Sequence, residues 1–320
     1  DVDYMRGLQI FDEDFLNYLE NFHFTGDIYA IPEGTVVFPR EPLVKVIAPI
    51  MEAQLVETAI LTIINHQSLI ATKAARVVNA ARGDGIMEFG LRRAQGPDAG
   101  TYGARAAMIG GCIGTSNVLT GKMFDVPVLG THAHSWIMSF PDEYTAFKTY
   151  AELYPDACTL LVDTYDTLKS GVPNAIRVFQ EMKEAGKLNG RYGIRLDSGD
   201  LAYMSKEARK MLDAAGFEDA VIAASSDLDE YLIDSLKSQG AKITSWGVGT
   251  NLITSKDCPA FGGVYKLAAV KTGEGDFVPK IKLSENTEKI TNPGNKTVYR
   301  IYEKENGKLK ADLICLVDDQ

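Results

Sequence analysis

Apolar and polar positions in the middle of the chain alternate between the spacing of strands and the spacing of helices. Short apolar runs ending at Asp163, Asp197, Ser225 and Gly249 predict four strands, and helical apolar spacing follows each of the first three. Earlier runs at 86–89, 112–116 and 126–130 predict three more strands. Repeated strand–helix units indicate a parallel sheet. About seven strands favour an irregular α/β barrel over a doubly wound sheet.

The two ends of the chain have a different pattern. Residues 1–25 predict a small helix, and residues 27–48 predict short strands with tight turns. From residue 265 onward, apolar and polar residues alternate between turn signals, which indicates antiparallel strands. We therefore expect a second, β-rich α+β domain from residues 1–50 and 266–320, beside a barrel domain of residues 51–265. A long helix over 52–81 has too many apolar positions for a surface helix, which predicts that it is largely buried or at an interface.

Composition narrows the class of protein. A chain of 320 residues that is 45% hydrophobic has ample material for a core. Acidic residues outnumber basic ones by 43 to 33, which argues against a general nucleic-acid binder. Nothing resembles a signal peptide or a membrane-spanning run, so we expect a cytoplasmic protein with no membrane partner. The four cysteines are far apart, which argues against disulfides and a structural zinc site.

Polar and glycine-rich clusters follow several of the predicted strands. Arginine pairs and glycine turns before helices hold phosphate oxygens, while aspartates hold Mg²⁺, ribose hydroxyls or an arginine. Each cluster also has an ordinary explanation, since an aspartate after a strand is often a helix N-cap and an arginine loop is often a solvated turn. Taken together, they indicate a phosphorylated substrate with more than one anionic group, with Mg²⁺. The clusters comprise Arg92 with Arg93, His134, Arg195 with Asp197 and Asp200, and Gly247 with Gly249 and Thr250.

Two histidines lie in the segment VPVLGTHAHSW, residues 126–136. A strand that ends in glycine, threonine and two histidines is typical of the edge where an α/β enzyme presents catalytic groups. Structural or metal-binding histidines fit the same pattern. The residues alone leave catalysis and these alternatives open for His132 and His134.

Five motifs in order resemble the nicotinate phosphoribosyltransferase family: FGLRRAQGPDAG, GTHAHSW, VDTYDTLKSGVPNAI, GIRLDSGDL and SWGVGTNLITS. The resemblance implies that nicotinate reacts with 5-phosphoribosyl 1-pyrophosphate to give nicotinate mononucleotide and pyrophosphate, in NAD salvage. It also implies coupled ATP hydrolysis through transient phosphorylation of His134, and a homodimer with the active site at the interface. Members have further segments at both ends, so we expect this chain to lack N- and C-terminal parts.

The same resemblance implies roles for individual residues. Phe89 matches an aromatic that stacks on the pyridine ring, and Arg92 matches an arginine near the ribosyl phosphate. Arg195 and Asp197 match residues that hold the base and the ribose with its pyrophosphate. Asp163 matches an acid near the histidine and phosphates. The match to the 5'-phosphate cradle comprises Ser225, Gly247, Gly249 and Thr250.

Substrate choice and the metal complete the expectations. Ser116 stands where the nicotinamide-using relative has an aspartate, and a serine donates to a carboxylate that an aspartate would repel. We expect Mg²⁺ to bind through substrate phosphates, with no protein ligand assigned. The alternatives are a nicotinamide or quinolinate phosphoribosyltransferase, or a non-catalytic nucleotide-binding module.

Overall fold

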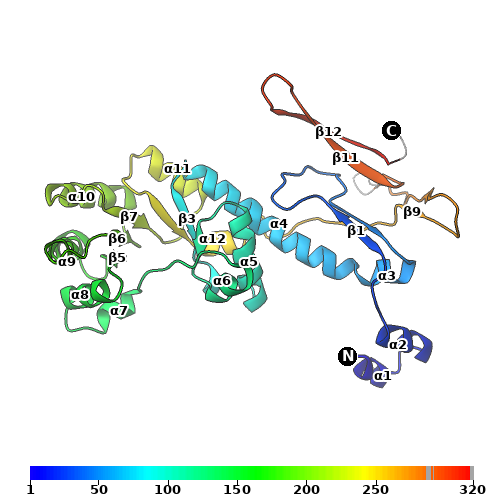
Figure 1. Cartoon of the computed structure of the whole chain (residues 1–320), viewed down its shortest axis with the longest axis horizontal. Coiled ribbons are helices and arrows are strands. Elements are labelled where there is room, and N and C mark those ends of the chain that lie inside the picture. Colours follow the sequence, from blue (N-terminus) through cyan, green and yellow to red (C-terminus); the bar gives the residue numbers. More distant parts are fainter. Residues whose placement is uncertain (286–289, 291, 318–320) are drawn as a thin grey trace. The chain divides into compact units, whose positions relative to one another are not determined.

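A computed structural model describes residues 1–285, 290 and 292–317 (Figure 1). The chain divides into two compact units, residues 64–262 and residues 1–63 with 263–320, and each is described here by itself. A compact unit need not fold independently, so the domain boundaries expected at residues 50 and 265 stay a prediction.

A parallel six-stranded sheet organises residues 64–262, with the strands in the order β4-β3-β8-β7-β6-β5. The predicted α/β fold is confirmed, and six of the seven expected strands form this sheet. The seventh, at 126–130, contributes only an isolated parallel bridge between Val128 and Thr115 of β4. Pro127 has no N–H to extend the pairing, and Gly130 comes two residues after Val128. The strands are β3 (Gly85–Glu88), β4 (Gly114–Thr115), β5 (Ala157–Leu161), β6 (Arg191–Leu196), β7 (Val221–Ala224) and β8 (Ser245–Val248).

Helices connect these strands and bury apolar faces in one core. The largest fully buried side chains include Trp246 of β8 and the phenylalanines at 147, 179 and 217. Several helices begin at side-chain caps: Asn117 and Asp200 accept hydrogen bonds from backbone N–H groups three residues on, at 3.2 and 3.0 Å. Asp200 thus has the ordinary role left open above. The helices are α5 (Pro97–Ile109), α6 (Val118–Phe124), α7 (His134–Met138), α8 (Glu143–Leu153), α9 (Val172–Glu184), α10 (Leu201–Ala214), α11 (Glu230–Ser238) and α12 (Thr250–Ile253), with short turns of 3₁₀-helix at Leu91–Arg93 and π-helix at Thr167–Gly171.

The long helical segment at 52–81 is two helices, α3 (Ile50–Leu55) and α4 (Glu57–Ala80). Only the second half of α4 is buried, through Ile70, Lys73, Ala74 and Val77, while Ile63 is exposed. The buried ammonium of Lys73 pairs with the Glu230 carboxylate at 2.6 Å.

Short elements make up the unit formed by the two ends of the chain. The single helix expected over residues 1–25 is two helices, α1 (Val2–Leu8) and α2 (Glu13–Glu20), because the backbone turns at Gln9 with a φ of 58°. Lys45 donates to the Asn295 side chain at 2.9 Å, and this contact joins the early and late segments. Their strands, as far as they are described, form separate antiparallel pairs: β1 (Asp27–Ala30) with β2 (Val44–Ile47), β9 (Ala269–Val270) with β10 (Val278–Pro279), and β11 (Lys296–Tyr302) with β12 (Leu309–Leu316).

None of the helices in the described part of the chain is both long and apolar enough to cross a membrane.

Candidate active site

The carboxyl ends of the six parallel strands lie at one edge of the sheet, and the register brings the predicted clusters to that edge. Glu88 at the end of β3 is level with Thr115 of β4 and Val248 of β8. Leu161 at the end of β5 is level with Arg195, and Leu196 is level with Ala224 of β7. Residues that directly follow these strands therefore share one surface, which is where parallel α/β enzymes have their active sites.

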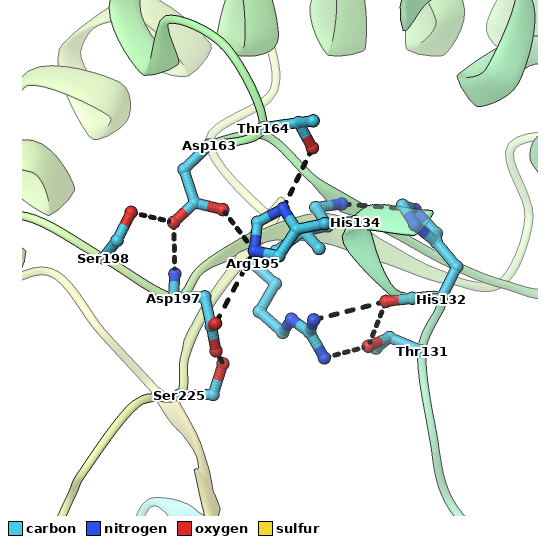
Figure 2. Close-up of polar contacts among 10 residues, drawn as sticks. Thr131, His132, His134, Asp163, Thr164, Arg195, Asp197, Ser198 and Ser225 are labelled. Atoms are coloured by element: carbon cyan, nitrogen blue, oxygen red, sulfur yellow. Dashed lines mark hydrogen bonds and ion pairs between the residues drawn. The ribbon is translucent and has the colours of Figure 1, made fainter. Parts of the chain in front are cut away.

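His134 lies at the centre of a group of polar side chains (Figure 2). It is the first residue of α7, and its Nδ1 lies 3.0 Å from the Thr164 hydroxyl. Its Nε2 lies 3.6 Å from Asp197 Oδ2 and 3.9 Å from Asp163 Oδ1. These carboxylates are too distant for hydrogen bonds, and both face the same nitrogen of the ring. The His134 side chain is 38% exposed, so a substrate has access to it.

The two aspartates differ in what their oxygens contact. Asp163 is buried, and its Oδ2 accepts from the Asp197 N–H at 2.8 Å and the Ser198 hydroxyl at 2.6 Å. Asp197 is partly exposed, and its Oδ1 accepts from the Ser225 hydroxyl. Asp163 therefore fixes the loop after β6, while Asp197 presents its other oxygen to His134.

Arg195 connects strand β6 to the segment that precedes His134. Its guanidinium donates to the Thr131 hydroxyl and, at 3.2 Å, to the His132 carbonyl (Figure 2). Burial lowers the pKa of Arg195, and the Asp197 and Asp163 carboxylates oppose that shift. The charge of Arg92 adds to the lowering, which places Arg92 within electrostatic reach of Arg195.

Phe89 directly follows strand β3 and lies against the neighbouring strand β8. Its N–H donates to the Val248 carbonyl at 2.8 Å. A Cβ atom on Gly247 would lie 2.5 Å from the Phe89 ring, so the glycine leaves the space that the ring occupies. Gly247 thus lies inside strand β8, where it contacts the Phe89 ring. Gly249 and Thr250, by contrast, form the turn into α12.

Arg92 and Ser116 occupy exposed positions at the same edge. Arg92 lies in the turn that follows Phe89, and the Ser116 N–H donates to the Glu88 carbonyl at 3.1 Å. The structure brings together His134, Asp163, Asp197 and Ser225 by direct contacts, and Phe89 with Gly247. Arg195 joins the first group through Thr131 and the His132 carbonyl. Among the described residues, no hydrogen bond or ion pair joins the side chains of these two groups.

His132 is buried and points away from the exposed ring of His134. Its Nε2 accepts a hydrogen bond from the Leu161 N–H at 3.2 Å, and its ring lies edge-on to Tyr150 with centroids 4.6 Å apart. Burial lowers the pKa of His132 to about 4, the backbone at Ala133 opposes the shift, and the charges of Arg195 and His134 add to it. His132 is therefore neutral at physiological pH.

The lowered pKa of His132 predicts an acid-dependent loss of stability. Between pH 6.5 and 4 the unfolded chain binds a proton at His132 that the folded chain does not. The contribution of His132 should therefore lower the free energy of unfolding by about 3 kcal/mol as the pH drops through that range. Above pH 6.5 His132 should not change the free energy of unfolding with pH. Urea denaturation of the wild type and of His132→Gln, which has no titrating ring, measures the difference; parallel pH dependences would contradict the prediction.

Comparison with known protein families agrees with these motifs. A model described as the N-terminal domain of nicotinate phosphoribosyltransferase matches residues 1–65, and the model of the nicotinate phosphoribosyltransferase family matches residues 85–289. The chain belongs to the nicotinate phosphoribosyltransferase family. The resemblance seen in the five motifs is thereby confirmed.

Individual members of the nicotinate phosphoribosyltransferase family align with all or most of the chain. The nicotinate phosphoribosyltransferase of Bacillus subtilis is 55% identical over 320 residues, which are all of this chain and 64% of that protein. The human nicotinate phosphoribosyltransferase is 34% identical over 346 residues, covering 91% of this chain and 63% of that protein. The chain thus spans slightly less than two thirds of these relatives.

Solved structures show the same fold. A crystal structure of human nicotinic acid phosphoribosyltransferase superposes with a TM-score of 0.83 at 31% identity, covering all of this chain and 70% of that one. A nicotinate-nucleotide pyrophosphorylase from Pyrococcus furiosus superposes with a TM-score of 0.74 at 27% identity, covering 93% of this chain and 70% of that one.

Glu88 is a residue that neither the motifs nor the resemblance to the nicotinate phosphoribosyltransferase family singled out. It is fully buried, its Oε1 accepts from the Gly90 N–H, and its Oε2 accepts from the Thr115 hydroxyl at 2.6 Å. Burial raises the pKa of Glu88, and the two hydrogen bonds oppose that shift. The carboxyl group joins the turn carrying Phe89 to the turn carrying Ser116. The sequence feature that could have identified Glu88 is a single acidic residue in the otherwise apolar strand GIMEF.

The described residues offer few protein ligands for the expected Mg²⁺. Among the described residues, no group of three or more His, Cys, Asp or Glu side chains is placed to hold a metal ion. Mg²⁺ often binds through one or two carboxylates while substrate phosphates and water complete its coordination. Asp197, with a partly exposed carboxylate, suits that kind of binding.

Proposed function

We propose that the protein is a nicotinate phosphoribosyltransferase of NAD salvage, which joins nicotinate to 5-phosphoribosyl 1-pyrophosphate and couples ATP hydrolysis to the reaction through His134. The observation that carries the proposal is the convergence of His134, Asp163, Asp197 and Arg195 at one edge of the sheet. The names of the family and of the relatives support the substrate assignment.

The transfer reaction requires positioning and charge stabilisation more than acid–base chemistry. As the bond from ribose C1 to pyrophosphate breaks, positive charge develops on the ribose and negative charge on the leaving group. The ring nitrogen of nicotinate is already a nucleophile, so no strong general base is needed. Arg195 and Arg92 supply positive charge near the phosphates, and Asp197 faces the ribose. Mg²⁺, when bound, neutralises the pyrophosphate oxygens.

His134 suits a second, phosphoryl-transfer step. Asp163 and Asp197 face Nε2 and favour the tautomer with its proton there, which leaves the Nδ1 lone pair on the side of Thr164. Nδ1 then bonds to the γ-phosphorus of ATP, the bond to the ADP oxygen breaks, and ADP leaves with the electron pair. The phosphorylated ring is positively charged while Nε2 keeps its proton, and the Asp163 and Asp197 carboxylates balance that charge. Water later hydrolyses the phosphohistidine and releases phosphate.

The proposal assigns the remaining site residues as the resemblance implied. Phe89 stacks on the pyridine ring, and Ser225, Gly249 and Thr250 bind the 5'-phosphate beside the start of α12. The contact of Gly247 with the Phe89 ring makes its role in the phosphate cradle indirect. The Ser225 hydroxyl would exchange its bond to Asp197 for one to phosphate.

A cytoplasmic homodimer with the active site at the subunit interface is part of the proposal. Val118, Leu119 and Met123 of α6 are exposed apolar side chains close in sequence to Ser116. A cluster of this kind is expected where a second subunit covers the surface.

Ser116 is expected to select nicotinate over nicotinamide. Ser116→Asp replaces a hydroxyl donor by a carboxylate that repels the nicotinate carboxylate and accepts from an amide N–H. We expect the ratio of kcat/KM for nicotinate to that for nicotinamide to fall by about 10-fold or more. Steady-state kinetics with both bases measure it, Ser116→Ala serves as the control for the loss of the hydroxyl, and an unchanged ratio in Ser116→Asp would refute the assignment.

Two other functions remain to be separated from this one. A phosphoribosyltransferase that acts on another pyridine base, nicotinamide or quinolinate, is one alternative. A non-catalytic nucleotide-binding module is the other. The group formed by His134, Asp163 and Asp197, called here the His134 cluster, favours a catalytic protein over that module.

Pyrophosphate release by the full-length protein tests the proposal. The assay contains 5-phosphoribosyl 1-pyrophosphate and Mg²⁺, with nicotinate, nicotinamide or quinolinate as the base, each with and without ATP. Release with nicotinate and its stimulation by ATP are expected. Release with another base instead would establish the first alternative, and no release from a folded protein would establish the second.

A further inference from the structure

We propose that His132 is a positioning residue, whose neutral ring fixes the segment 130–134 to strand β5 and thereby places both His134 and Arg195. The inference deepens the proposed function and rests on it, because the two groups being placed are the phosphorylated histidine and a phosphate-binding arginine.

Strand β5 is at the edge of the sheet, so the backbone N–H groups on its outer side have no neighbouring strand to pair with. The Val162 N–H, one residue after β5, donates to the Arg195 carbonyl of β6 at 3.2 Å, so the preceding Leu161 N–H points to the opposite side. Leu161 is fully buried, where an unpaired N–H is costly. The Nε2 atom of His132 accepts this hydrogen bond at 3.2 Å.

The His132 ring replaces a pairing that the backbone does not make. The segment 126–130 reaches the opposite edge of the sheet through the Val128–Thr115 bridge. The chain then continues toward β5, where the contact with Leu161 is made by the His132 side chain. Tyr150 and Phe147 of α8 pack against the ring, with centroids 4.6 and 6.2 Å away, and fix its orientation.

Two functional groups depend on this one anchor. The carbonyl of His132 accepts from Arg195 at 3.2 Å, and the neighbouring Thr131 hydroxyl accepts from the same guanidinium. His134 follows two residues later, and its ring lies between Thr164 and Asp197. A shift of the backbone at His132 therefore moves the histidine ring and the arginine contacts together.

Other roles for His132 fit the structure less well. Direct acid–base catalysis needs access to substrate, but the side chain is buried and 8% exposed as a residue. Metal binding needs further ligands, and none of the described His, Cys, Asp or Glu residues forms a suitable group. What remains is the acceptor at Nε2, which requires the unprotonated ring.

Two substitutions separate the acceptor from the shape of the ring. His132→Phe keeps an aromatic ring against Tyr150 but removes the acceptor, whereas His132→Gln removes the ring and keeps an oxygen that reaches the Leu161 N–H. His66→Gln, at a half-buried histidine of α4 outside the site, is the matched control. All are made in the full-length protein, and melting temperatures establish that each is folded.

The main readout is the rate at which acid-labile phosphate from radiolabelled ATP appears on the protein without nicotinate. We expect His132→Phe to slow this rate by about 10-fold or more, because small misplacements of reacting groups have large kinetic effects. His132→Gln should remain within about 3-fold of the wild type, as should His66→Gln. Should His132→Phe not fold, His132→Asn, whose oxygen is one bond too short, takes its place.

The outcomes also separate this inference from the proposed function. A His132→Phe variant that labels as fast as the wild type overturns the inference, as does a His132→Gln variant as slow as His132→Phe. If the wild type itself forms no phosphoenzyme, the histidine step of the proposed function is wrong. In that case the KM for 5-phosphoribosyl 1-pyrophosphate tests the inference, because a misplaced Arg195 would bind this substrate less well. A rise in KM of about 10-fold in His132→Phe without an equal fall in kcat supports the inference, and an unchanged KM overturns it.

Discussion

His134→Ala should abolish ATP hydrolysis and phosphoenzyme formation while slow, ATP-independent synthesis of the mononucleotide persists. The imidazole is the only nucleophile in the proposed phosphoryl transfer, so its removal should lower the ATPase rate by about 10³-fold or more. The transfer to the base depends on Arg195, Asp197 and the substrate phosphates, which the substitution leaves in place. Radiolabelled ATP followed by acid treatment measures the phosphoenzyme, and pyrophosphate release measures synthesis.

Ser135→Ala is the matched control, because Ser135 is the exposed neighbour of His134 in the same short helix α7. It should label and turn over as the wild type does. Persistent acid-labile phosphate on His134→Ala would show that another residue is phosphorylated, and loss of all synthesis together with the ATPase would show that His134 acts in the transfer itself.

Gly247→Ala should weaken nicotinate binding without a comparable effect on the phosphorylated substrate. The new methyl group would lie 2.5 and 2.6 Å from two carbons of the Phe89 ring, so the ring must leave its seat against β8. We expect the KM for nicotinate to rise by about 10- to 100-fold, because the stacking surface for the pyridine is displaced. Inserting a methyl group into a packed site should also cost about 1–3 kcal/mol of stability.

Gly262→Ala is the control for adding a methyl group, since no heavy atom of the described residues, apart from Gly262 and its two chain neighbours, lies within 4 Å of the position its Cβ would take. The double variant Phe89→Ala with Gly247→Ala tests the cause. If the clash with the ring is responsible, adding Gly247→Ala to Phe89→Ala should have little further effect on the KM for nicotinate. Full additivity of the two changes would mean that Gly247 acts elsewhere, for example on the phosphate.

The fold could be predicted because apolar runs and helical spacing alternate clearly over residues 86–249. The edge of the sheet that carries the site followed from the same pattern, because parallel strands bring their carboxyl ends together wherever each lies in the sequence. Asp163, Asp197 and Ser225 were found in this way, and their mutual contacts agree with it.

Contacts that depend on the order of strands could not be predicted. The position of β5 at the sheet edge gives His132 an N–H to bind, and nothing in the sequence near His132 indicates it. Likewise, Gly247 contacts Phe89 only because β8 pairs with β3, far away in the sequence. The turn at Gln9 was missed because a residue other than glycine adopts a positive φ there.

The central place of β8 in the sheet has a consequence for how the site is assembled during folding. The β3–β4 pair and the β5–β6–β7 group are joined within the sheet only by β8, the last of its strands to be synthesised. Pairing Gly85 with Ser245 closes the longest loop between any two strands of this sheet, and long-range closure is slow. A nascent chain that stops before Ser245 would contain every residue of the His134 cluster, yet its Phe89 would have no strand to lie against.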